Sequence, residues 1–134
     1  MVLVDTSVWI EVFRRHSTVR IEDVVDFDEI VTCLPVIQEV LQGVDDERSY
    51  RVARDAMIAL HIVDDPMPAA AYDYAVTLYR QAQRAGRTVR SGVDCLIAAC
   101  ALRHDLEILH NDRDFSALST IAALRVRDLR GRRV

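Results

Sequence analysis

The sequence predicts a three-layer α/β/α sandwich, in which helices cover both faces of a mostly parallel central sheet. Short apolar runs alternate with amphipathic segments along the whole chain, and this alternation is typical of strand–helix–strand units. A length of 134 residues and a hydrophobic content of 51% suit one core. Because the chain shows no internal repeat, low-complexity tract or Gly/Ser linker, we expect a single domain over residues 1–134.

The first strand is predicted at residues 1–4, a short apolar run that ends at Asp5. Thr6 or Ser7 can cap a helix directly after it. That helix should have one apolar face, because four side chains recur along it with helical spacing: Trp9, Val12, Phe13 and His16. The chain therefore begins with a strand followed by an amphipathic helix.

The rest of the first half should hold two more strands and two more helices. We place the strands at 29–33 and 61–63 and the helices at 36–42 and 46–60. Pro35 suits the first turn of one helix, and Gly43 suits its end. The other helix should bury the side chains that recur in phase along it, which are Val52, Ala56, Ala59 and Leu60.

The second half is predicted to contain three helices and two strands. We place the helices at 68–85, 94–104 and 115–122 and the strands at 107–110 and 124–126. The first of these helices should present one face made of Tyr72, Ala75, Tyr79 and Ala82. The second is apolar on all sides from 95 to 102, so it should lie at the centre of the molecule.

The charges are unevenly distributed along the chain. All 17 basic residues are Arg, and the formal net charge is −4. Residues 1–75 carry a net −9, whereas residues 76–134 carry a net +5. An acidic protein should not attract nucleic acid through its overall field, so such a substrate would need bound cations, a local Arg surface, or both. The absence of Lys excludes Schiff-base and P-loop lysine chemistry.

Cysteine spacing and the lack of long apolar stretches indicate the compartment. Cys33, Cys95 and Cys100 lie in apolar segments without metal-binding spacing, so we expect reduced core cysteines and no zinc site. The longest uncharged stretch has ten residues, and a membrane span needs about 20. The first residues also lack the basic segment of a secretory signal. We therefore expect a cytoplasmic protein without a membrane partner.

Acidic residues stand where α/β folds bind ligands, beyond the carboxyl ends of the strands. Asp5 ends the first strand, Asp94 begins the central helix, and Asp112 and Asp114 follow the strand at 107–110. Glu39 is a charge in an apolar part of the helix at 36–42. Taken singly, these acids also have structural interpretations, because an Asp can cap a helix and a Glu can face solvent.

Together the acids favour a cation site. Two unit charges about 4 Å apart repel by roughly 4 kcal/mol at an effective dielectric near 20, and a divalent cation offsets that repulsion. Oxygen ligands without nearby Cys select Mg²⁺ or Mn²⁺ over zinc. Such ions activate water and stabilise a leaving oxygen. The predicted chemistry is phosphodiester hydrolysis.

At these acids the sequence resembles the PIN-domain nucleases, and among them the VapC-type toxins of bacterial toxin–antitoxin pairs. The matching segments span essentially the whole chain in the family's order: residues 4–10, Glu39, residues 94–99 and residues 109–115. The resemblance implies endonucleolytic cleavage of RNA by a Mg²⁺- or Mn²⁺-dependent ribonuclease that acts as a toxin. It also implies a VapB-like antitoxin partner and a homodimer.

The resemblance implies a role for each site residue. The catalytic acids would be Asp5, Glu39, Asp94 and Asp112, and the metal would be bound by Asp5, Asp94, Asp112 and Asp114. Asp112 and Asp114 are alternatives for the fourth acidic position. Thr6 and Ser7 would support the site. The segment at 88–93 varies in the family, so the resemblance leaves the role of Arg90 open: a contact with a substrate phosphate, a contact with an antitoxin carboxylate, or a pair with Asp94.

Three other interpretations can be weighed against this one. A phospho-acceptor receiver domain requires a lysine, and the chain has none. A haloacid-dehalogenase-like phosphatase would have an Asp-x-Asp pair at the first strand, but Thr6 and Ser7 follow Asp5. The alternative that stays open is a catalytically degenerate PIN-fold module that binds RNA or a partner.

Overall fold

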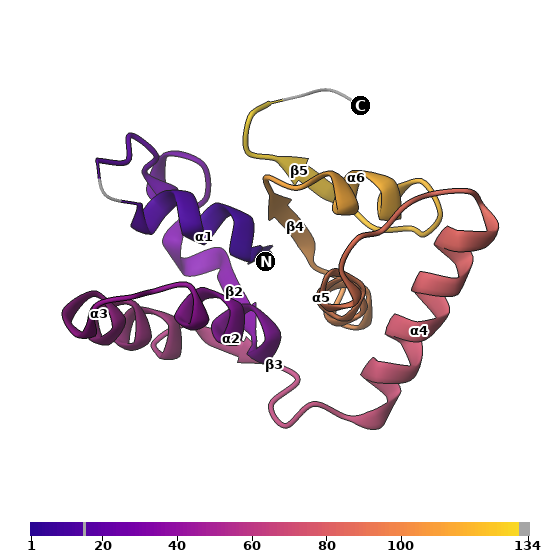
Figure 1. Ribbon diagram of the computed structural model, residues 1–134, viewed down its shortest axis with the longest axis horizontal. Helices are drawn as coiled ribbons and strands as arrows, with labels where there is room; N and C mark the ends of the chain where they lie inside the picture. The colour runs from indigo at the N-terminus through magenta and orange to yellow at the C-terminus, as the bar shows by residue number, and fades with distance from the viewer. Residues whose placement is uncertain (15, 132–134) are drawn as a thin grey trace.

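A five-stranded parallel sheet runs through the molecule in the computed structural model, which describes residues 1–14 and 16–131 (Figure 1). The strands are β1 (Val2–Val4), β2 (Ile30–Cys33), β3 (His61–Val63), β4 (Glu107–His110) and β5 (Val126–Asp128). Their order in the sheet is β3-β2-β1-β4-β5, and each neighbouring pair is parallel. The chain first builds outward from β1 to β3 and then returns to the other side of β1. The strand order therefore reverses between β1 and β4.

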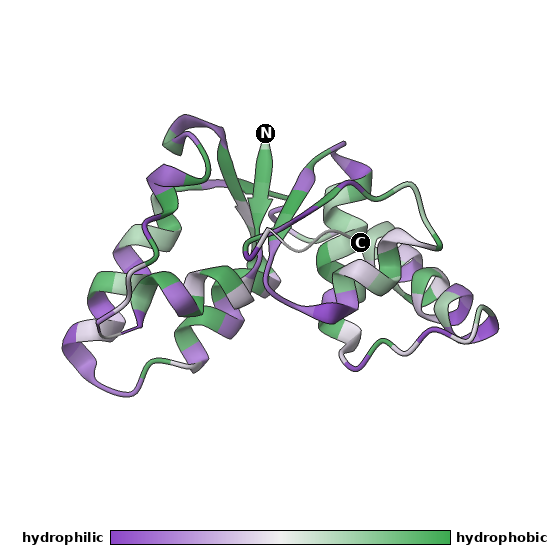
Figure 2. Cartoon of the chain, turned by 90° about the horizontal axis from the view of Figure 1, so that it is seen from above, coloured by the Kyte–Doolittle hydropathy of each residue, from purple (hydrophilic) through white to green (hydrophobic). Residues whose placement is uncertain are grey.

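Helices cover both faces of this sheet, as the sequence predicts. They are α1 (Thr6–Phe13), α2 (Leu34–Gln42), α3 (Glu47–Ile58), α4 (Ala69–Arg84), α5 (Gly92–Arg103) and α6 (Arg113–Ser119). Figure 1 shows the first three on one side of the strands and the last three on the other, and Figure 2 shows from above that helices lie on both sides of the strands. The predicted three-layer α/β/α class is confirmed, with a sheet that is parallel throughout. No helix of the described residues is long and apolar enough to cross a membrane.

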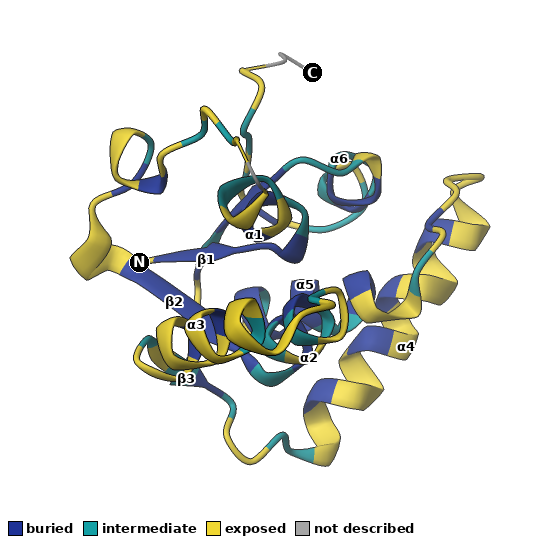
Figure 3. Cartoon of the chain, turned by 60° about the vertical axis from the view of Figure 1, so that its left-hand side comes forward, coloured by how far each residue is buried: buried dark blue, intermediate teal, exposed yellow. Residues whose placement is uncertain are grey.

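The core is centred on β1, β4 and α5. Leu3 and Val4 of β1 are fully buried, and so are Ile108 and Leu109 of β4. Every residue of α5 from 97 to 101 is also fully buried, which confirms the central position predicted for this helix. Figure 3 shows buried residues along β1 and β2 but on only one side of α4. β1, β4 and α5 therefore hold the most deeply buried part of the core.

Helix α3 turns a different face inward from the one predicted. Ala53 and Met57 are its buried residues, whereas Val52 is 60% exposed. Ala56 is also exposed. Most of the other positions of α3 are polar, so its weak apolar pattern fits two neighbouring faces, and packing against α2 decides between them.

Helix α4 also departs from its predicted face. Ala75 and Ala82 are buried as predicted, but Ala71 and Leu78 complete the buried face, while Tyr72 and Tyr79 are exposed. This helix packs against the Ala-rich α5. Because small side chains allow two helices to approach closely, the alanines take the contact and the larger tyrosines lie beside it.

Several element boundaries shift by a few residues. Helix α1 ends at Phe13, so His16, which has a φ of 63°, does not extend its apolar face. Helix α5 begins at Gly92, two residues before Asp94. Helix α6 ends at Ser119. It begins at Arg113 because Asp112 caps its N-terminus by accepting the Asp114 N–H. The last strand lies at 126–128, two residues later than predicted.

Candidate metal centre

The predicted acids gather where the strand order reverses, beyond the carboxyl ends of β1 and β4. Val4 pairs with Leu109, and the N–H of Asp5 donates to the Leu109 carbonyl at 2.9 Å. Asp5 therefore leaves β1 beside the point where Asp112 leaves β4. This is the position at which open parallel sheets bind their ligands.

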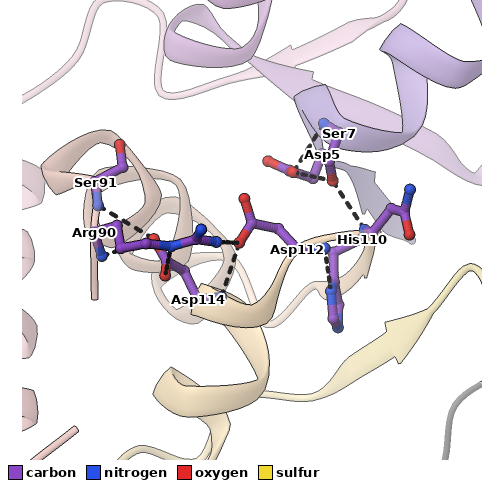
Figure 4. Close-up of polar contacts among 8 residues, drawn as sticks. Asp5, Ser7, Arg90, Ser91, His110, Asp112 and Asp114 are labelled. Carbon is purple, nitrogen blue, oxygen red and sulfur yellow. Dashed lines mark hydrogen bonds and ion pairs between the residues drawn. The ribbon is translucent and has the colours of Figure 1, made fainter. Parts of the chain in front are cut away.

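Ser7 connects the two strand ends (Figure 4). Oδ2 of Asp5 caps α1 by accepting the Ser7 N–H at 3.0 Å and the Ser7 hydroxyl at 2.5 Å. The Ser7 oxygen in turn accepts the N–H of Asn111 at 2.8 Å. One hydroxyl thus fixes the Asp5 carboxylate and the start of the loop that carries Asp112.

The second oxygen of Asp5 has no partner. Asp5 is 2% exposed, and its Oδ1 accepts no hydrogen bond from any residue in the described part of the chain. Burial raises the pKa of Asp5 to about 6, although hydrogen bonds from Ser7 act in the opposite direction, and the charge of Glu39 adds to the rise. A buried acceptor without a donor is a group that a cation, a water or a ligand can satisfy.

Thr6 connects Glu39 to the acids that lie beyond the carboxyl ends of β1 and β4, a region that we call the crevice. The Thr6 hydroxyl donates to Glu39 Oε1 at 2.8 Å, and Thr6 itself is buried. Glu39 is half-buried on α2, which packs against α1. The sequence placed Thr6 at the site in a supporting role, and this hydrogen bond is a specific form of that support.

Three other carboxyl groups form a cluster of their own. Asp94, Asp112 and Asp114 each contribute one oxygen, and these oxygens all lie within 4.8 Å of one another. Asp94 and Asp114 are buried, and Asp112 is half-buried. Asp94 comes from the first turn of α5, while the other two come from the segment that joins β4 to α6. Asp5 and Glu39 lie outside this group of three.

The pKa of Asp94 shows that the cluster disfavours a further negative charge. Burial raises the pKa of Asp94 to about 9, and the nearby carboxyl groups of Asp114, Asp5 and Asp112 raise it further in the same direction. Asp94 therefore carries a proton at neutral pH unless another cation replaces it. The contribution of Asp5 to this shift shows that Asp5 and the cluster form one electrostatic unit.

Asp114 and Asp112 differ in what already binds them. Asp114 Oδ2 accepts the backbone N–H groups of Arg90 and Ser91 at 3.0 and 3.2 Å, and its Oδ1 lies 3.5 Å from Arg90 Nε. The hydrogen bonds to Asp112 fall on Oδ1, from the Asp114 N–H at 2.9 Å and from Arg90 Nη2 at 3.2 Å. Arg90 therefore pairs with Asp112 and Asp114 and not with Asp94, which was one of the three roles that the sequence left open for it.

His110 is a residue of the site that sequence reasoning missed. It is 1% exposed at the end of β4, and its Nδ1 accepts the N–H of Asp112 at 3.2 Å. Its ring packs against Phe115 at 5.6 Å. Burial lowers the pKa of His110, which keeps the imidazole neutral and able to accept. Its place at the end of a strand, two residues before Asp112, was the available signal.

The arrangement fits a hard divalent cation. Its donors are carboxylate oxygens, the ligands that Mg²⁺ and Mn²⁺ prefer, and no Cys or His stands among the three clustered residues. The unpartnered Asp5 Oδ1 and the protonated Asp94 are both features that a bound cation would relieve. Chemically, such a centre can activate water against a phosphate ester.

Comparisons with known proteins identify the family and the fold. The family model of the PIN domain matches residues 2–121. Over 137 aligned positions the chain is 36% identical to "Ribonuclease VapC11" of Mycobacterium tuberculosis, which covers 97% of this chain and 100% of that protein.

Two solved structures share the fold. VapBC2 from Rickettsia felis, bound to a promoter DNA fragment, gives a TM-score of 0.76 at 16% identity and covers 96% of this chain and 98% of its own. VapC20 of Mycobacterium tuberculosis, a toxin that cleaves the Sarcin-Ricin loop, gives 0.70 at 19% identity, with 93% and 99% covered. Both likenesses extend along nearly the full chain and show that the fold is shared.

Proposed function

This chain belongs to the PIN-domain family, among the VapC ribonucleases, and we propose that it is a metal-dependent endoribonuclease that acts as the toxin of a toxin–antitoxin pair. The observation that carries the proposal is the cluster of Asp94, Asp112 and Asp114, together with a buried Asp5 that is close enough to raise the pKa of Asp94 and whose Oδ1 has no partner among the described residues. In a degenerate module without a bound cation, carboxyl groups this close together would only lower the stability of the fold, because their charges repel one another.

We assign Asp5, Asp94 and Asp112 as the residues that would hold Mg²⁺ or Mn²⁺. Asp112 suits the fourth acidic position better than Asp114, because Asp114 Oδ2 already accepts two backbone N–H groups whereas the bonds to Asp112 fall on Oδ1. When bound, the ion would supply an activated water and charge stabilisation for the leaving oxygen. Asp114 anchors the segment at 90–91 and stays next to the ligands.

The remaining residues position the reacting groups. Ser7 fixes the Asp5 carboxylate and the loop after β4, and His110 fixes the backbone N–H of Asp112. Glu39, held by Thr6, is the carboxylate on the α2 side of the crevice. We assign it to orient the attacking water and to accept the proton that the water loses.

The substrate and the partners that we propose rest on the charge distribution of the chain and on its family. Arg84 and Arg87 are exposed on the +5 half of the chain, at the end of α4 that leads to Arg90, and we propose that they contact the RNA backbone. We further propose a VapB-like antitoxin and a homodimer. The Rickettsia felis relative was solved as a VapBC assembly, which supports the antitoxin partner.

The deciding experiment is cleavage of total RNA by the purified protein, with Mn²⁺ or with EDTA. We expect cleavage with Mn²⁺, its loss in EDTA, and at least a hundredfold slower cleavage by Asp5→Asn. The matched control is Asp55→Asn, which changes an exposed aspartate of α3 and should cleave like the wild type. Equal cleavage by Asp5→Asn and the wild type would overturn the nuclease assignment.

Growth arrest tests the toxin role separately. Expression of the chain alone should arrest growth, and co-expression of the cognate antitoxin should relieve the arrest. If the chain cleaves RNA in vitro but leaves growth unchanged, the nuclease role stands and the toxin role fails.

A further inference from the structure

Arg90 meets the acidic cluster in two separate ways (Figure 4). Its backbone N–H, together with that of Ser91, is bound by Asp114 Oδ2 at 3.0 and 3.2 Å. Its guanidinium lies across the cluster, with Nη2 3.2 Å from Asp112 Oδ1 and Nε 3.5 Å from Asp114 Oδ1. The backbone contacts fix the segment, whereas the side-chain contacts supply a positive charge.

The guanidinium is held less firmly than the backbone that carries it. The Arg90 side chain is 65% exposed, and ion pairs at that exposure contribute little to stability. The Asp114 carboxylate that anchors the backbone is by contrast buried, with its side chain 3% exposed. The side chain can therefore leave the cluster while residues 90 and 91 stay in place.

Arg90 and a divalent cation need the same negative charge. In the part of the chain that the structure describes, Arg90 is the one arginine that forms ion pairs with Asp94, Asp112 or Asp114. A cation that Asp112 helped to hold would share that carboxylate with the guanidinium on Oδ1 and would repel it. Two positive groups on one carboxylate oppose each other at this short range.

We propose that the Arg90 guanidinium is a displaceable counter-ion of the metal centre. It pairs with Asp112 and Asp114 in the metal-free protein and turns outward when a divalent cation binds Asp112. In the outward position it stands at the mouth of the crevice, where an RNA phosphate would replace the carboxylates as its partner. This inference rests on the proposed metal-dependent function and adds a competition within it.

The competition predicts an unusual effect of removing a positive charge. Arg90→Gln should bind Mn²⁺ three- to tenfold more tightly than the wild type, because the ion no longer has to displace the guanidinium. The same variant should show a raised KM for RNA, because it lacks the phosphate contact. Arg54→Gln is the matched control, since it removes an exposed arginine of α3 that forms no ion pair with the cluster, and its Mn²⁺ affinity should equal that of the wild type.

The test is titration of each protein with Mn²⁺ in the absence of RNA, with free Mn²⁺ measured by electron paramagnetic resonance. Tighter binding by Arg90→Gln alone supports the inference. Unchanged or weaker binding by this variant overturns the inference and leaves the ribonuclease proposal intact. No saturable binding by either the wild type or Arg90→Gln overturns both.

A second measurement follows the Arg90 side chain of the wild-type protein directly as metal is added. The Nε–Hε resonance of Arg90 in the wild type, assigned by its loss in Arg90→Gln, should be distinct in EDTA and should move to the solvent-exposed position on addition of diamagnetic Mg²⁺. A resonance that stays in place while Mg²⁺ saturates the protein would show that the guanidinium is not displaced, and the inference would fail.

Discussion

The Thr6 hydroxyl donates a hydrogen bond to Glu39 Oε1 at 2.8 Å, and so the residue that follows Asp5 holds a carboxylate 33 positions further along the chain. The contact joins α1 to α2 and brings Glu39, which lies on the helix after β2, close to Asp5, which follows β1. The orientation of Glu39 in the crevice therefore depends on a hydroxyl outside the acidic cluster.

Replacing this hydroxyl should slow RNA cleavage without weakening metal binding. Thr6→Val keeps the shape of the side chain but leaves Glu39 without its donor, and we expect about tenfold slower cleavage, equivalent to about 1.4 kcal/mol. Thr6→Ser keeps the hydroxyl and should cleave at close to the wild-type rate. If Thr6→Val and Thr6→Ser cleave equally fast, the hydrogen bond does not position Glu39.

Loss of the Ser7 hydroxyl should destabilise the protein. Ser7→Ala removes a donor to Asp5 and an acceptor of the Asn111 N–H at once. We expect a loss of about 1–3 kcal/mol in the free energy of unfolding, measured by urea denaturation, because the buried Asp5 carboxylate and the half-buried Asn111 each lose a partner. The control is Thr18→Ala, which removes an exposed hydroxyl and should leave the urea midpoint unchanged.

In EDTA, the stability of the protein should fall as the pH rises. The pKa of Asp94 is about 9 in the folded protein against an ordinary value of 3.8, so the folded state binds the extra proton. A raised pKa of this kind contributes stability that is complete below about pH 4 and is lost progressively as the pH rises towards 9. Asp5, with a pKa of about 6, acts in the same direction over the lower part of this range.

The neutral variant Asp94→Asn isolates this effect. Without metal, it should be more stable than the wild type at pH 8, by on the order of 2 kcal/mol, and the difference should shrink at pH 5. Urea denaturation in EDTA at the two pH values measures both quantities. A constant difference between pH 5 and pH 8 would contradict the assignment of a proton to Asp94.

A bound divalent cation should offset the repulsion among these acids and stabilise the folded protein. With Mn²⁺ at about a hundred times its Kd, the folded state gains about 2.7 kcal/mol, which should raise the Tm by several degrees. Calorimetry of Asp112→Asn should show a much smaller rise, and Asp55→Asn should show the full one. An equal rise in all three proteins would place the ion somewhere other than this cluster.

Local signals made much of the fold predictable. The run from Val2 to Val4 ends at Asp5, and the apolar run at 107–110 ends shortly before Asp112, so the strands and the acids behind them were read from adjacent residues. The all-round apolar pattern of α5 likewise gave its central place. Where the pattern was weak the prediction failed: α3 buries Ala53 and Met57 instead of the face that contains Val52.

The sequence by itself determined which residues are acidic, which elements carry them and at which strand ends they stand, because each of these depends on neighbours a few positions away. The tertiary structure decided which side chains meet. Pairing of β1 with β4 brings Ser7 to Asn111 across 104 positions, and the path from α4 to α5 sets Arg90 against Asp112 and Asp114 instead of Asp94. Strand order and helix packing set these distances. Neither of them leaves a local pattern in the sequence from which the contact could be predicted.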